Sequence, residues 1–109
     1  MNVNDEKDRA LLRAKINLET SRMPWTELLR FFAAGSVIVV ADATDLVEVA
    51  ACVADDDKEA VAKWMTEGLI SKVSDAQAEA WLKADAALWA VVVKPWILVQ
   101  ERKDRAGMH

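Results

Sequence analysis

The sequence of 109 residues contains one cysteine, one histidine, three glycines and two prolines, and it has no tyrosine. Since Cys52 is the only cysteine, no disulfide can form within the chain, and a structural zinc site would need histidines that are missing. Gly35, Gly68 and Gly107 lie far apart, which excludes a glycine-rich phosphate-binding loop. These shortages predict a protein without a bound metal, nucleotide or other cofactor.

Residues suited to nucleophilic catalysis are equally few. The only histidine, His109, is the last residue, so nothing would hold it beside a serine or a cysteine. Cys52 follows Glu48 by one helical turn, and a neighbouring carboxylate raises the pKa of a thiol, whereas a nucleophile needs a lowered pKa. We therefore assign no catalytic residue. An enzyme that uses carboxylates as acid and base, in pairs such as Asp42 and Asp45, is the alternative.

Basic residues are outnumbered, since 14 Lys and Arg against 18 Asp and Glu give a net charge of −4. Such a chain repels polyanions, so nucleic-acid binding is not expected. Long apolar runs are missing too, and the charged start MNVNDEKDR does not resemble a signal peptide. Together with the single cysteine, these features predict a cytoplasmic protein outside the membrane. They do not specify a small-molecule ligand.

The residues that are present indicate a globular chain, with 53% hydrophobic and 29% charged residues. We expect a single domain over residues 1–109, with frayed ends at 1–4 and 102–109.

Apolar spacing and capping residues predict five helices. The first covers Asn4–Ser21, and the second covers Pro24–Ala34 and ends before Gly35. The third begins at Asp42, Thr44 or Asp45, the fourth begins near Asp56 and runs to Glu67, and the fifth opens at the capping box Ser74–Gln77. On the first helix, the apolar stripe comprises Leu11, Ala14 and Leu18, widened by Leu12 and Ile16.

Three strands are predicted, at Ser36–Ala41, Leu69–Val73 and Leu88–Gln100. The last would span about 43 Å at ~3.3 Å per residue, more than a small domain holds, so it must bend or protrude, with part of it at a sheet edge near Lys94-Pro95. Read as one strand, its apolar face comprises Trp89, Val91, Val93, Ile97 and Val99. Its mixed face comprises Val92, Lys94, Trp96, Leu98 and Gln100.

The predicted fold class is α+β, with about five helices packed on a small, mainly antiparallel three-stranded sheet in a winged-helix-like element order. The helix at the position of a DNA-recognition helix, DKEAVAKWMTE, holds three acidic and two basic residues, a poor balance for a major groove. DNA binding is therefore the least favoured function. A single core is expected to contain Trp25, Leu28, Phe32, Val39, Val49, Val53, Trp64, Trp81, Val91 and Val93.

Four segments occur in a distinctive order: WTELLRFFAAGSVIVVA, DLVEVA, the W-x-x-x-G pattern of Trp64–Gly68, and WAVVVKPWILVQ. Together they resemble the small bacterial family known as domain of unknown function 2288, over roughly Leu12 to Glu101. The resemblance implies a short cytoplasmic bacterial protein, and it implies neither an activity nor catalytic residues.

The mixed face of the last strand is the candidate interface, formed by Val92, Lys94, Trp96 and Leu98. Tryptophan is enriched at interaction sites, and Trp96 is the only one of the five that lies outside the predicted core stripes. We expect a non-catalytic interaction or adaptor protein that contacts a protein partner or forms a homodimer. The alternative is that the first helix covers this face within the monomer.

Overall fold

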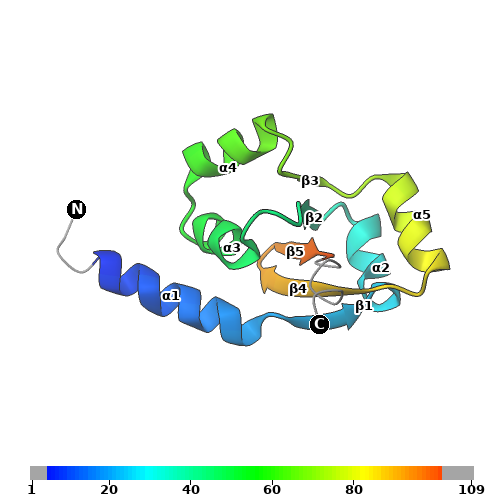
Figure 1. Cartoon of the computed structure of the whole chain (residues 1–109), viewed down its shortest axis with the longest axis horizontal. Coiled ribbons are helices and arrows are strands. Elements are labelled where there is room, and N and C mark those ends of the chain that lie inside the picture. The colour runs from blue at the N-terminus through cyan, green and yellow to red at the C-terminus, as the bar shows by residue number, and fades with distance from the viewer. Residues whose placement is uncertain (1–4, 102–109) are drawn as a thin grey trace.

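The computed structural model describes residues 5–101, which form five helices and five strands (Figure 1). In chain order the elements are α1 (Asp5–Glu19), β1 (Ser21–Pro24), α2 (Trp25–Ala33), β2 (Val37–Val40), α3 (Leu46–Ala54), α4 (Lys58–Thr66), β3 (Ile70–Lys72), α5 (Asp75–Lys83), β4 (Ala87–Val93) and β5 (Trp96–Gln100). The predicted cap Asn4, the predicted fraying of 1–4 and 102–109, and His109 lie outside the described residues.

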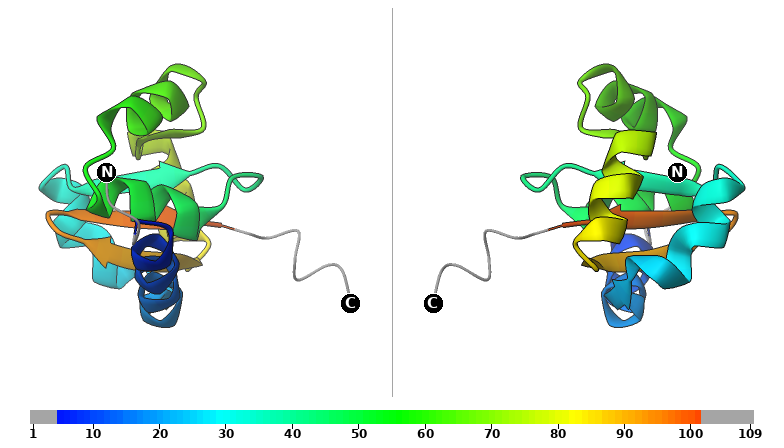
Figure 2. Two further views of the ribbon diagram at one scale, coloured as in Figure 1. Left: turned by 90° about the vertical axis from the view of Figure 1, so that its left-hand side faces the viewer. Right: turned by 90° about the vertical axis from the view of Figure 1, so that its right-hand side faces the viewer.

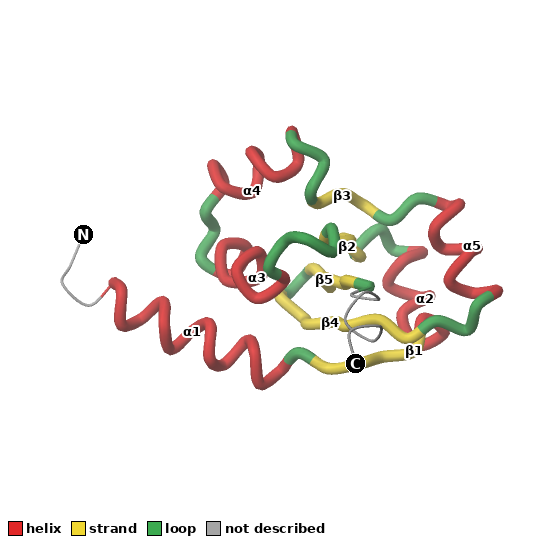
Figure 3. The backbone as a smooth tube through the Cα atoms, viewed as in Figure 1, coloured by secondary structure: helices red, strands yellow, loops and turns green. Residues whose placement is uncertain are grey.

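All five strands form one mixed sheet in the order β1-β4-β5-β2-β3 (Figure 3). β2 runs parallel to β5, whereas the other neighbouring strands are antiparallel. The prediction of a mainly antiparallel three-stranded sheet with a winged-helix-like order is therefore wrong. The α+β class itself is correct.

The sequence did not predict β1 or the division of the last strand into two, and the reasons differ. β1 has the sequence SRMP, which is short, half polar and mostly exposed, and it forms because it pairs with β4. The expected strand Leu88–Gln100 is two strands, because Lys94 and Pro95 turn the chain back on itself and place Val93 opposite Trp96. The chain therefore bends near Lys94-Pro95, as predicted, but β4 and β5 both lie inside the sheet, so the prediction of a sheet edge there is wrong.

Helices cover both faces of the sheet. In Figure 1, α1, α3 and α4 lie to one side of the strands and α2 and α5 to the other, and Figure 2 shows each helical group from its own side. The predicted single core is accordingly two clusters, one on each face. Trp25, Leu28 and Trp81 are buried on the α2/α5 face, whereas Val49 and Val91 are buried on the α1/α3/α4 face.

Capping residues set where three helices begin. The predicted capping box of α5 is present, with Gln77 N donating to Ser74 Oγ (3.1 Å) and Ser74 N donating to Gln77 Oε1 (3.3 Å). Among the possible caps of α3, the structure uses Asp45. The cap of α4 is Asp57, one residue beyond the predicted start, because Asp56 occupies the turn before it at φ 58°.

Candidate functional site

The structure separates Val92 from the other three residues predicted as an interface, Lys94, Trp96 and Leu98. Side chains opposite each other across a hairpin point to the same face of the sheet. Because Val93 lies opposite Trp96, the turn reverses the odd–even pattern, and even-numbered residues of β4 and β5 face opposite ways. The predicted assignment of all even residues to one face is wrong for this reason.

The four residues also differ in exposure. Val92 lies on the α2/α5 face and is 52% exposed, whereas Lys94 lies in the exposed turn. Leu98 is fully buried in the cluster that includes Ile16 of α1 and Val49 of α3, so helices of the same molecule cover it. Of the four, Trp96 is the one that is partly exposed on the α1/α3/α4 face.

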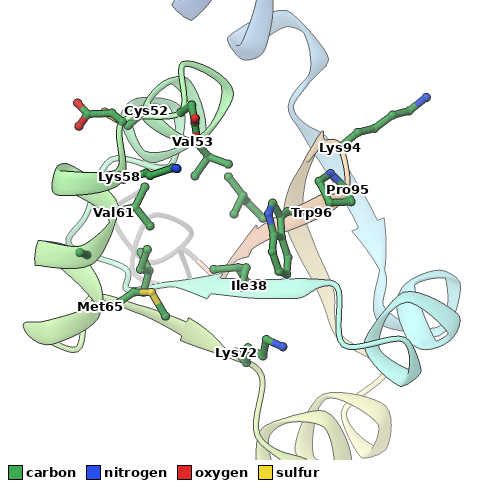
Figure 4. A pocket seen from close by; sticks show the side chains of 15 residues that line it. Ile38, Cys52, Val53, Lys58, Val61, Met65, Lys72, Lys94, Pro95 and Trp96 are labelled. Carbon is green, nitrogen blue, oxygen red and sulfur yellow. The ribbon is translucent and has the colours of Figure 1, made fainter.

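A surface groove runs between Trp96 and helices α3 and α4, with a cavity volume of about 450 Å³ (Figure 4). We call it the α4 groove and define it by six apolar residues: Ile38, Val53, Val61, Met65, Trp96 and Leu98. Val53 of α3 and Val61 and Met65 of α4 line the helical side, while Ile38 of β2 lies beneath. Three of the four predicted interface residues, Lys94, Trp96 and Leu98, line this groove.

The helical wall of the groove is only lightly packed. No residue of α4 is buried, although its sequence KEAVAKWMT carries an apolar stripe. Val61 and Trp64 are partly buried, and Met65 is 52% exposed. α4 therefore presents to solvent much of the apolar surface that a helix of this kind would bury in a core.

Three lysines line the groove: Lys58 at the start of α4, Lys72 on β3 and Lys94 in the hairpin turn. Lys72 and Lys94 extend from opposite sides of Trp96 (Figure 4). Lys72 Nζ lies 5.8 Å from the centre of the Trp96 ring, within the range of a cation–π contact. None of the three lysines forms an ion pair with a carboxylate of residues 5–101.

Cys52 lies at the α3 side of the groove and is 3% exposed. Its Sγ accepts a hydrogen bond from Arg9 Nη2 (3.5 Å) and lies 3.8 Å from Glu48 Oε2. Burial raises the pKa of the Cys52 thiol, and the Glu48 carboxylate adds to this rise, while the hydrogen bond from Arg9 opposes it. The geometry thus favours the protonated thiol, which is the less nucleophilic form.

The acidic run between α3 and α4 has structural roles. Asp55 pairs with Arg9 at 3.2 Å, Asp56 forms the turn, and Asp57 accepts a hydrogen bond from Ala60 N. Within residues 5–101, no three histidine, cysteine or acidic side chains lie close enough to hold a metal ion. Over the same residues, no helix is long and apolar enough to cross a membrane.

Sequence reasoning missed the contribution of α4 to the site. From the sequence, Trp64 of α4 was expected in the core and Val61 and Met65 were given no role in an interface, because helical spacing does not reveal how much of a helix is covered. Lys58 and Lys72 are distant from Lys94 in sequence, and the sheet order brings them to the same groove.

These features define an α+β protein with a mixed five-stranded sheet, helices on both faces and an open apolar groove at one end of the sheet. The family model described as "Protein of unknown function (DUF2288)" matches residues 11–101, and the chain belongs to this family. The predicted resemblance is thereby confirmed.

A similar structure is the NMR solution structure of PA1075 from Pseudomonas aeruginosa. It is 47% identical to this chain, with a TM-score of 0.77, and the match covers 91% of this chain and 92% of that one. No curated protein matches this sequence. The family relationship is thus shown at the level of sequence and fold, and it carries no described activity.

Proposed function

We propose that this protein is a non-catalytic interaction domain that holds a segment of a partner protein in the α4 groove. The observation that carries the proposal is the uncovered apolar wall: α4 buries no residue, and Met65 is 52% exposed beside the partly exposed Trp96. Solvated apolar surface of this kind is costly unless a partner covers it. The occupant we infer is a protein segment that places apolar side chains in the groove.

Catalysis by carboxylates is less well supported. The acidic side chains nearest the groove are Asp56 and Asp57, and the structure uses them in a turn and as a helix cap. The groove is lined by ammonium groups and apolar side chains, and its one thiol, Cys52, has a raised pKa. These groups do not form an acid–base pair. Recognition of a partner is the better use of these groups.

We place the protein in the bacterial cytoplasm, where a single reduced cysteine such as Cys52 is stable. A second copy of the chain is the rival occupant. The interface predicted for a dimer is weakened because Val92 and Leu98 lie on opposite faces and Leu98 is buried. A dimer would therefore rest mainly on Trp96 and Lys94.

Site-specific photo-crosslinking in the native cells tests the proposal. A photoreactive amino acid would replace Met65 in the groove or, as the control, Leu82 of α5, which is 48% exposed outside it. We expect a crosslink to one different protein from position 65 and none from position 82. That crosslink should disappear in a chain that also carries Trp96→Ala. A crosslinked species of twice the chain mass would replace the adaptor proposal with a homodimer, and equal crosslinking from both positions would contradict it.

A further inference from the structure

Lysines of the groove lie on both sides of Trp96. Lys72 and Lys94 extend from opposite sides of the ring, and Lys58 lies on the helical side of the groove (Figure 4). The two carboxylates among the lining residues, Asp56 and Asp57, directly precede Lys58 in the chain. The chain as a whole has a net charge of −4. The groove is thus positively charged near Trp96, although the protein as a whole is acidic. Such a separation of charge favours contact with acidic partners and disfavours contact with basic ones.

The two lysines are also unpaired within the described chain. No carboxylate of residues 5–101 forms an ion pair with Lys72 or Lys94, although such pairs hold Arg9, Arg13 and Lys83 elsewhere. The cation–π contact of Lys72 with Trp96, at 5.8 Å, limits where that ammonium group can lie. A carboxylate arriving at the ring would meet the Lys72 ammonium group beside an aromatic face, while Lys94 extends outward from the hairpin turn on the other side of the ring (Figure 4).

We propose that the occupant of the α4 groove is an acidic amphipathic segment of another protein. Its apolar side chains enter between Met65 and Trp96, and its carboxylates pair with Lys72 and Lys94. This inference rests on the proposed function and specifies the chemistry of its partner. The cavity of about 450 Å³ has room for a few large side chains and for no folded domain, so the recognised unit is a short segment.

Two synthetic peptides separate charge from apolar contact. Both carry leucines at positions i, i+3, i+4 and i+7; one has glutamates at the remaining positions and its twin has lysines. Fluorescence anisotropy with the full chain would measure their affinities at low and high salt. We expect the acidic peptide to bind about tenfold more tightly than the basic twin at low salt, and the difference to shrink as salt screens the charges.

Matched variants test whether the preference for the acidic peptide comes from Lys72 and Lys94. The double variant Lys72→Gln/Lys94→Gln should bind the acidic peptide about fivefold more weakly, because exposed ion pairs contribute little individually. The control Lys15→Gln/Lys63→Gln removes two exposed lysines outside the groove and should bind like the wild type. Thermal unfolding of both variants should match the wild type, since all four side chains are exposed.

The outcomes distinguish this inference from the proposed function. If both peptides bind equally and Met65→Ser abolishes both, the groove is an apolar docking site and the acidic partner is refuted. If neither peptide binds, the inference fails, while the crosslink from position 65 decides the proposed function separately. Equal losses in the Lys72/Lys94 and Lys15/Lys63 variants would show a general charge effect and would also refute it.

Discussion

The two faces of the sheet use the same kinds of residue in different ways. On the α2/α5 face, Trp25 and Trp81 are 1% and 5% exposed, and their ring centres lie 5.0 Å apart in an edge-on contact. On the α1/α3/α4 face, Trp64, Trp89 and Trp96 are all partly exposed. Tryptophans of the first face fill a closed core, whereas those of the second lie at its margins. Both faces hold buried clusters, and they differ in that the tryptophans of the α1/α3/α4 face lie at the exposed edge of its cluster.

The reason lies in the helices that cover each face. α2 begins directly after β1 and is followed through Gly35 by β2, so both of its ends are joined to the sheet. α4 is likewise joined to the sheet at one end, through Gly68 and β3, but its other end leads only to the turn at Asp56, and it packs mainly against α3 and β3. A helix held in this way leaves part of its apolar stripe in water.

The largest effect should come from removing one tryptophan from each face. Trp81→Ala deletes a buried side chain and should lower the free energy of unfolding by about 3 to 5 kcal/mol. Trp64→Ala removes a partly exposed ring of α4 and should cost about 1 kcal/mol. Urea unfolding of the two variants beside the wild type measures both values. Equal losses would show that α4 is as firmly packed as α5.

Much of this architecture could be predicted from the sequence, because helix signals are local. The capping box Ser74–Gln77 and the terminating glycines Gly35 and Gly68 mark helix ends by their own chemistry. Strand pairing is not local. β1 exists through its register with β4, and nothing within SRMP requires it.

Two side-chain assignments show the same limit. On α1 the expected stripe includes Leu11 and Leu18, yet these are 64% and 85% exposed, while Ile16 is buried. A helix with two apolar sides does not reveal which side meets the sheet. Gln100, expected on a half-polar face, is buried because its Nε2 donates to Ala41 O at 2.8 Å and to Thr44 O. That partner loop is distant in sequence.

For the candidate site, the sequence indicated Trp96 and its surroundings but not the boundaries of the groove. The hairpin turn at Lys94 and Pro95 decides which side chains share a face with Trp96, and the sheet order decides which distant residues join them. Both are tertiary properties, so a single-strand interpretation of LWAVVVKPWILVQ assigns the wrong neighbours.

A smaller effect should distinguish the two helix-ending glycines. Gly35 and Gly68 have φ values of 77° and 76°, where an alanine costs about 1 to 2 kcal/mol. Gly35→Ala should reduce global stability, because α2 is packed in the closed core. Gly68→Ala should mainly loosen the end of α4. Hydrogen exchange would show faster exchange confined to α4 amides in Gly68→Ala, and protection lost throughout the sheet in that variant would contradict the contrast between the faces.

The smallest predicted effect is the pH dependence that Cys52, on the α1/α3/α4 face, confers on the stability of the fold. Its thiol lines the groove but is 3% exposed, so it should behave as a core group. Since burial raises the pKa of Cys52 in the folded state, the unfolded chain releases this proton first as pH increases. The stabilisation is therefore complete below about pH 8.5, the ordinary thiol pKa, and is lost as pH rises through the raised folded value. Denaturation midpoints measured from pH 7 to 10 should fall more steeply for the wild type than for Cys52→Ala. Parallel curves would mean that the thiol is solvated in the groove. The solvent-exposed part of the α1/α3/α4 face would then extend to α3.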